Sequence, residues 1–155
     1  MKPKISTILL SGLTAGILDI ITAIVVYAGV LNLTTTQKIL QSIAAGALGK
    51  NAFSGGWFTA FAGLVFHFLI ATIFAAIYLL VFRCYTSIFK NKWVAGFLYG
   101  IVVWAIMNLG VLPLVANKTF VFEVKYFLIS ITIIIVMVGI PISIITDKRE
   151  NLHTK

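Results

Sequence analysis

The apolar positions of the chain fall into four long runs, which short polar segments separate. Polar residues are rare inside the runs, and most charged residues lie at their edges. A transmembrane helix needs about 20 predominantly apolar residues in a row. The pattern therefore predicts a single transmembrane domain over residues 1–155, with four spanning helices over about residues 5–33, 57–82, 93–115 and 126–146.

The segment between the first two runs has a different pattern. Apolar residues recur at helical spacing from Gln37 to Leu48, with polar residues on the opposite face. Thr34 and Gln37 fit a capping box that would begin such a helix. A helix over residues 37–48 is about 18 Å long, too short to cross a bilayer. We therefore predict an all-α integral membrane protein, a four-transmembrane-helix bundle with a short amphipathic or re-entrant helix between the first and second spans.

Composition excludes a water-soluble domain. The chain is 61% apolar and 10% charged, whereas soluble domains are roughly 45–50% apolar and about 25% charged. The net charge of +8 comes from basic residues that punctuate the apolar runs, so we expect contacts with lipid headgroups and no nucleic-acid partner. Cys84 is the only cysteine, which excludes an internal disulfide and a cysteine-based zinc site. No sequence motif indicates a metal or a cofactor.

The distribution of basic residues predicts the orientation in the membrane. Lysine and arginine accumulate on the cytoplasmic side of membrane proteins. One side would carry eight basic residues and the other four, so we expect both termini in the cytoplasm. The richer side holds Lys2, Lys4, Arg83, Lys90, Lys92, Lys148, Arg149 and Lys155, and the poorer side holds Lys38, Lys50, Lys118 and Lys125.

Two ionisable residues lie deep inside the predicted spans. Asp19 is about 20 Å of helix from either end of the first span, and His67 is about 15 Å into the second. Because ionisable groups are costly at that depth, they are the main candidates for an intramembrane polar site. Both belong to stripes of small residues that favour close helix contact, so we expect the two faces to pack and an Asp19–His67 hydrogen bond to form. Gly12, Gly16 and Gly63 belong to these stripes.

The third and fourth spans carry fewer polar residues. Gly96, Gly100 and Asn108 recur at four-residue spacing on the third span, so the glycines are candidate packing positions. Asn108 either only contributes to helix packing or donates an interhelical hydrogen bond. Pro113 should end or kink this helix and Pro141 should kink the fourth, which we expect to form the lipid-facing wall.

Two interpretations of Asp19 and His67 remain open at this point. The pair could be a buried polar clasp that fixes the register of two helices, or it could be a proton or cation site on a transport pathway. A hydrolase needs a nucleophile, a base and an orienting group, and one acid with one histidine is too few. We therefore predict no catalytic residues and no enzymatic activity.

One stretch resembles a known family. Gly63, His67, Ala71 and Tyr78 belong to the pattern G-x-x-x-H-x-x-x-A-x-x-F-A-x-x-Y, which is followed by the run Trp93-Val94-Ala95-Gly96 and later by Leu112-Pro113. Over about residues 60–115 the chain is similar to the YagU-like group of uncharacterised four-span bacterial inner-membrane proteins. The resemblance implies a bacterial inner (plasma) membrane protein with a link to acid or envelope stress, and it supplies no catalytic residues.

These observations leave three hypotheses about function. The first is a structural or accessory four-helix membrane protein, either as a homo-oligomer or within a larger membrane complex. The second is a small proton-coupled transporter or channel that uses Asp19 and His67. The third, a lipid-modifying enzyme, is disfavoured because polar side chains are scarce.

Overall fold

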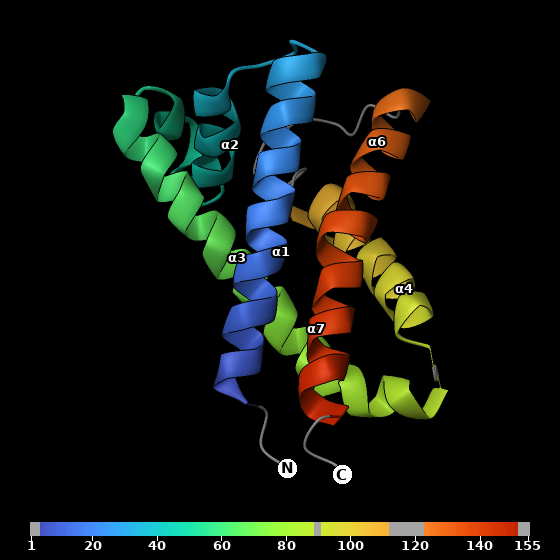
Figure 1. The fold of residues 1–155 in the computed structure, drawn as a ribbon. Helices are drawn as coiled ribbons and strands as arrows, with labels where there is room; N and C mark the ends of the chain where they lie inside the picture. Colours follow the sequence, from blue (N-terminus) through green and yellow to red (C-terminus); the bar gives the residue numbers. More distant parts are fainter. Residues whose placement is uncertain (1–3, 89–90, 112–122, 152–155) are drawn as a thin grey trace.

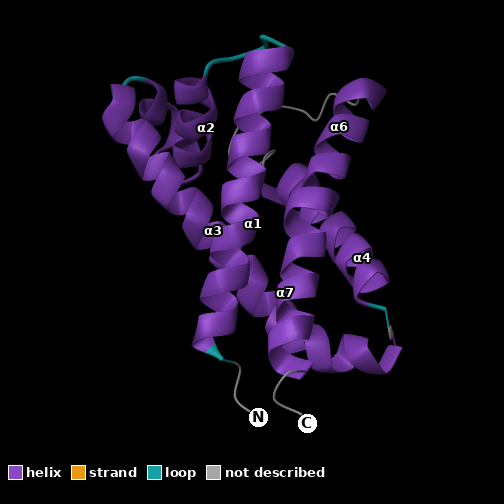
Figure 2. Cartoon of the chain, in the orientation of Figure 1, coloured by secondary structure: helices purple, strands orange, loops and turns teal. Residues whose placement is uncertain are grey.

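The computed structural model describes residues 4–88, 91–111 and 123–151, which are almost entirely helical (Figures 1 and 2). No strand occurs within these ranges. Several helices continue directly into π-helical segments. In chain order the elements are α1 (Ile5–Ala23) with π-helix η1 (Ile24–Val30), α2 (Thr36–Leu48), the 3-10 turn η2 (Gly49–Phe53), α3 (Gly56–Ile88), α4 (Lys92–Ala105) with π-helix η3 (Ile106–Val111), and α6 (Val124–Ile134), π-helix η4 (Ile135–Gly139) and α7 (Ile140–Asn151) in succession.

Four helical stretches are long and apolar enough to cross a membrane, which confirms the predicted fold class. They are Ile5–Val30, Gly56–Val81, Lys92–Val111 and Val124–Glu150. One face of α1 leaves Leu9, Leu13, Ile17 and Ile21 exposed at four-residue spacing. Such a continuous apolar surface suits lipid and not water. The chain is therefore a multi-pass membrane protein whose described part is built from helices.

Some boundaries differ from those expected. The second span was expected to end near residue 82, but α3 continues to Ile88. The fourth span was expected to end near residue 146, but α7 continues to Asn151. Side-chain contacts explain this second difference: Lys92 Nζ lies 3.6 Å from Asp147 Oδ2, and the Thr7 hydroxyl donates to Glu150 Oε1 at 3.3 Å.

Several expectations fall outside the described residues. They concern Pro113 as the end of the third span, most of the loop over 116–125, and the basic residues Lys2, Lys90, Lys118 and Lys155. Pro141 lies in α7, directly after η4. Because proline lacks a backbone N–H, the regular α-helical pattern is interrupted beside it.

The short helix α2 begins one residue later than the expected capping box implies. Its N-cap is Thr35, whose backbone is extended and whose hydroxyl oxygen accepts the backbone N–H of Lys38 at 3.3 Å. The cap pairs Thr35 with Lys38, so the predicted pairing of Thr34 with Gln37 is wrong. A threonine run offers several candidate caps, and the backbone conformation selects one of them.

Helix α2 packs into the angle between α1 and α3 (Figure 1). Leu40 is buried with Ile20 and Ala60, and Gly63 lets the backbone of Leu40 approach α3 closely. Gln41 is 3% exposed, and its amide donates to the carbonyl of Gly56 at 3.0 Å and to the Thr59 hydroxyl at 3.3 Å. Ile20 lies about 15 Å along the helix from Val30. Thus α2 dips part-way along the bundle and does not lie on its end.

Glycines bring helix backbones together near the end of the bundle that carries both termini, here called the N/C end. A Cβ at Gly12 would lie 2.7 Å from the Cα of Thr72, and one at Gly96 would lie 2.8 Å from the Cα of Ile140. Gly100 has a similar contact, 2.6 Å, with the Cα of Ile135. Small residues at such contacts are the usual means of holding helices together in lipid. The α1–α3 and α4–α7 pairs are therefore closed at this end.

Away from α2, the opposite end of the bundle is packed less closely. A Cβ at Gly29 or Gly110 would meet nothing within 4 Å among the described residues. Both glycines lie in π-helical segments, at the far ends of the first and third spans. The spans therefore separate toward this end, and Figure 1 shows α3 inclined away from α6.

Alanine substitutions at two glycines should distinguish tight from open contacts. In Gly100→Ala the added methyl group would lie 2.6 Å from the Cα of Ile135. Because that neighbour is backbone, the helices must move apart, and we expect a loss of about 1–3 kcal/mol in the free energy of unfolding. Thermal melting of the purified protein in detergent, followed by circular dichroism, measures this loss.

Gly110→Ala is the matched control, since its Cβ meets no described atom. It should melt at or slightly above the temperature of the unsubstituted protein, because alanine favours helix over glycine. Equal losses in the two variants would contradict close packing as the cause.

Candidate functional site

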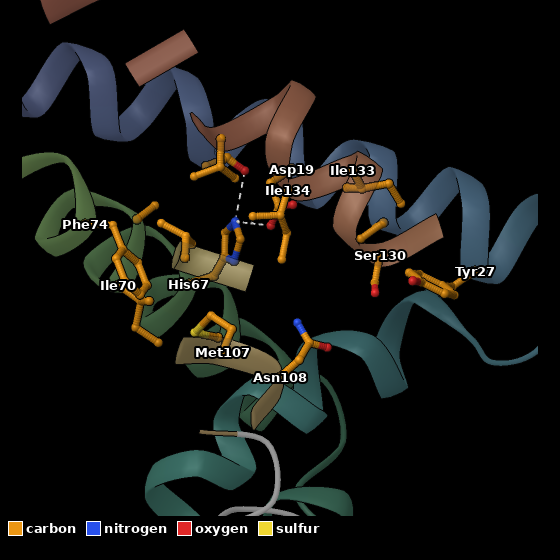
Figure 3. A pocket seen from close by; sticks show the side chains of 15 residues that line it. Asp19, Tyr27, His67, Ile70, Phe74, Met107, Asn108, Ser130, Ile133 and Ile134 are labelled. Carbon is orange, nitrogen blue, oxygen red and sulfur yellow. Dashed lines mark hydrogen bonds and ion pairs between the residues drawn. The ribbon is translucent and has the colours of Figure 1, made fainter. Parts of the chain in front are cut away.

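A cavity of about 330 Å³ lies between the four spans, beyond the closely packed N/C end. Its wall is mostly apolar, with contributions from α1, α3, α4, α6 and the three π-helical segments. Five polar residues line it, and Figure 3 shows them around the open space: Asp19, Tyr27, His67, Asn108 and Ser130.

Asp19 and His67 lie next to each other on the wall of this cavity (Figure 3). The Nε2 atom of His67 lies 3.9 Å from Oδ2 of Asp19. The side chains are 13% and 23% exposed, respectively, so the pair is mostly buried but reachable from the cavity. Asp19 lies about 16 Å of helix from Val30 and about 21 Å from Ile5, close to the middle of the first span.

The expected hydrogen bond between these two side chains does not form. His67 Nε2 instead lies 2.9 Å from the backbone carbonyl of Gly16, one turn before Asp19 on the same helix. A carbonyl oxygen only accepts, so Nε2 carries the hydrogen and donates it. A Cβ at Gly16 would lie 2.9 Å from the Phe68 ring, so the glycine allows α3 to pack closely against α1 beside this carbonyl.

In this arrangement both ionisable groups have atoms that are still able to form hydrogen bonds or bind a proton. Among the described residues, no N–H or O–H group lies within hydrogen-bonding distance of the Asp19 carboxylate. The Nδ1 atom of His67 points away from Gly16 and Asp19 (Figure 3). Asp19 can therefore accept a donor or pair with a cation, and His67 can take up or release a proton at Nδ1 while Nε2 stays bonded to Gly16.

The π-helical segments place several residues on the cavity wall. Tyr27 belongs to η1, Asn108 to η3 and Val138 to η4, and all three line the cavity. A π-turn widens the helix and changes which residues share a face, and such turns are frequent at functional sites. Asn108 donates to the carbonyl of Trp104 on its own span at 3.1 Å, so its hydrogen bond is intrahelical, whereas an interhelical bond was one of the two expectations.

A second, smaller hollow adjoins the cavity. It has a volume of about 140 Å³ and shares Tyr27, Asn108 and Ser130 with the larger one. From there it extends to Glu123 and Tyr126 at the beginning of α6. The route from Asp19 thus leads toward the loosely packed end of the bundle.

Aromatic groups border this hollow. The rings of Trp104 and Phe127 meet edge to face, with centroids 4.9 Å apart, and both line it. The indole N–H of Trp104 donates to the Ser130 hydroxyl at 2.8 Å. These contacts join the third and fourth spans beside the route.

A closely packed layer, here called the floor, closes the cavity on its N/C side. Phe74, Val103 and Val138 belong both to the cavity wall and to the core cluster behind it. Within that cluster the rings of Tyr78 and Tyr99 meet with centroids 4.8 Å apart. The cavity is therefore sealed toward one end of the bundle and continues toward the other.

Hydrogen bonds tie the floor to three spans. The Tyr78 hydroxyl donates to Ser143 at 2.7 Å, and the Ser143 hydroxyl donates to the carbonyl of Lys92 at 2.7 Å. The Tyr99 hydroxyl donates to the carbonyl of Phe74 at 2.5 Å. These bonds satisfy hydroxyls that are otherwise buried among apolar side chains.

Sequence reasoning missed Tyr27 and Ser130. Tyr27 follows Asp19 by about two helical turns, so its spacing placed it on the same face and could have indicated it. Ser130 is one of few polar residues on a span that we expected to face lipid only. The structure shows that this span also contributes Ile134 and Val138 to the cavity wall.

The chemistry available in the cavity is the binding of protons and cations. Asp19, His67 and Tyr27 are the titratable side chains among its described lining residues. Within the described ranges, no group of three or more His, Cys, Asp or Glu side chains is placed to hold a metal ion. The chain matches no protein-family model, no curated protein and no solved structure.

Proposed function

We propose that this protein is a small proton-coupled membrane transporter and that Asp19 and His67 form its coupling site. The observation that carries the proposal is the position of this pair on the wall of a cavity, about halfway along the first span. Ionisable groups at membrane depth are costly and mark ion and substrate pathways by default.

The geometry favours this function over a purely structural clasp. A clasp gains its energy from a direct hydrogen bond in a dry interface, whereas the side chains of Asp19 and His67 are 3.9 Å apart beside an open volume. The bond from His67 to Gly16 does join α1 to α3, so His67 also stabilises the fold. Membership in the YagU-like group stays part of the proposal, and proton coupling agrees with the link to acid stress that the resemblance implies.

We also propose a bacterial plasma membrane as the location, with both termini in the cytoplasm. The two ends of the described chain lie at the same end of the bundle (Figure 1). Lys92, Lys148 and Arg149 belong to segments at that end, whereas Lys38 and Lys50 belong to the α2 region at the opposite end. In this orientation the floor faces the cytoplasm, and the hollow beside Glu123 leads outward.

Reporter fusions test the orientation. Alkaline phosphatase is active only outside the cytoplasm, and green fluorescent protein folds only inside it when exported through the general secretory route. A fusion at Lys155 should be fluorescent and lack phosphatase activity, and a fusion after Lys118 should show the reverse, because the basic bias sets the topology. Phosphatase activity at Lys155 would overturn it.

Transport itself is tested with the purified protein in liposomes that contain the pH dye pyranine. Solutes of three charge classes are added outside, each lacking a titratable proton. At least one class should change the luminal pH faster than in protein-free liposomes. Asp19→Asn should reduce this response to the protein-free rate, because asparagine keeps the shape of aspartate but cannot exchange a proton.

Asp147→Asn is the matched control, since it removes a carboxylate from an ion pair with Lys92 that is partly exposed and away from the cavity. It should respond like the unsubstituted protein. The proposal fails if no class of solute moves protons, or if Asp19→Asn retains the full response while melting normally.

A further inference from the structure

We infer that the cavity binds a monovalent organic cation with an aromatic or apolar body, and that this cation and one proton alternately neutralise Asp19. The inference rests on the proposed transport function and names its substrate class.

Charge is the first argument. Asp19 is the only acidic residue, and no lysine or arginine occurs, among the described residues that line the main cavity. Glu123 is the only charged residue among those that line the adjoining hollow. Both volumes thus present a carboxylate without a fixed basic residue in the wall, which favours cations and repels anions.

The state of the Asp19 carboxylate is the second argument. It is mostly buried, receives no hydrogen bond from any described residue, and lies 3.9 Å from His67. A buried carboxylate with so few partners is stabilised by any cation that reaches it. An ammonium group that enters the cavity would supply the missing charge.

Aromatic side chains provide the third argument. Tyr27 and Phe74 line the main cavity, and Trp104, Tyr126 and Phe127 line the hollow. Aromatic faces attract cations within about 6 Å of the ring centroid. Lys125 Nζ already lies 5.9 Å from the centroid of the Tyr126 ring, so the rings of Tyr27, Phe74, Trp104 and Phe127 are the ones considered for a ligand. The wall therefore suits both the charge and the body of an organic cation.

Volume limits the size of the ligand. The cavity measures about 330 Å³, at the small end of the range of about 300–1,000 Å³ for ligand pockets. It fits one compact molecule with a single ring, and a lipid with two acyl chains is too large.

The charges of the cavity imply a one-for-one exchange. In the proposed exchange, Asp19 and His67 share one proton when no ligand is bound, which makes the pair neutral overall, whichever of the two carries it. A cation bound beside the carboxylate supplies the same positive charge, so this proton leaves through the hollow to water. Holding both would leave a net positive charge in a mostly apolar wall, which is unfavourable. His67 keeps its Nε2–H bond to Gly16 in both states.

The titratable groups that face this pair bear on the exchange. Tyr27 of η1 is the only further titratable side chain among the described residues of the cavity wall, and α3, α4 and α6 add none besides His67. Proton binding within the cavity is therefore expected to involve chiefly Asp19 and His67.

The experiment uses pyranine-loaded liposomes with an acidic lumen and three probes of similar size. The probes are benzyltrimethylammonium, benzyl alcohol and benzenesulfonate, which carry a positive, zero and negative charge and no exchangeable proton in the working range. Benzyltrimethylammonium added outside should raise the luminal pH in exchange for protons, and the other two should match protein-free liposomes.

Two variants locate the site. Asp19→Asn should abolish the response to benzyltrimethylammonium. Glu123 is exposed, and its side chain makes no capping bond to α6. Glu123→Gln should therefore keep the maximal rate and raise the half-saturating concentration about two- to fivefold, as expected for an exposed charge pair. Asp147→Asn again serves as the control. Either a full response in Asp19→Asn or an unchanged half-saturating concentration in Glu123→Gln overturns the inference.

Competition with protons gives an independent measurement. Each unit decrease in pH should raise the dissociation constant of benzyltrimethylammonium for the detergent-purified protein by up to about tenfold, because one displaced proton is linked to each bound cation. A dissociation constant independent of pH contradicts the exchange.

The three probes distinguish a wrong substrate class from a wrong transport function. If benzyl alcohol or benzenesulfonate drives proton movement through Asp19 and benzyltrimethylammonium does not, the substrate class is wrong and the transport function stands. If none of the three probes moves protons, the transport function fails and the inference fails with it.

Discussion

The close approach of helix backbones at glycines near the N/C end is the constraint on which the rest of the structure depends. Helices in lipid gain no hydrophobic free energy by associating, because acyl chains are as apolar as the side chains. Packing therefore depends on surfaces that fit closely, and the contacts of Gly12, Gly96 and Gly100 with facing Cα atoms provide them. These contacts fix α1 against α3 and α4 against the fourth span over one half of their length.

The close packing at the N/C end leaves the other half of the bundle open. Where glycine contacts end, α3 inclines away from α6 (Figure 1), and α2 fills only the angle between α1 and α3. The volume left among the four spans is the cavity, and the π-helical segments η1 and η3 place Tyr27 and Asn108 on its wall. Asp19 and His67 lie at the boundary between the two halves, where the packing is dry enough to restrict them and open enough to leave them accessible.

Hydropathy predicted the four spans and α2, because apolar length and helical spacing are properties of the residues themselves. It could not predict the N-cap of α2 or the π-turns, which depend on which backbone groups find partners. Asp19 and His67 were identified as candidates because they are ionisable residues deep inside apolar runs. Their geometry could not be predicted in this way. The carbonyl of Gly16 accepts the hydrogen bond from His67 that we expected Asp19 to share, and a sequence does not show which main-chain acceptors are within reach.

The proposed transport function requires the floor to open, and its hydrogen bonds indicate what that involves. Three of them join α3, α4 and α7: Tyr78 to Ser143, Ser143 to Lys92, and Tyr99 to Phe74. Each contributes about 1 kcal/mol net, so releasing all three costs about 3 kcal/mol, within the typical range of coupling free energies between sites. Phe74 lines the cavity, and its backbone carbonyl accepts the bond from Tyr99. The cavity wall and the floor therefore share this residue, and a ligand would shift the balance between a closed and an open floor by as much as its affinities for the two states differ.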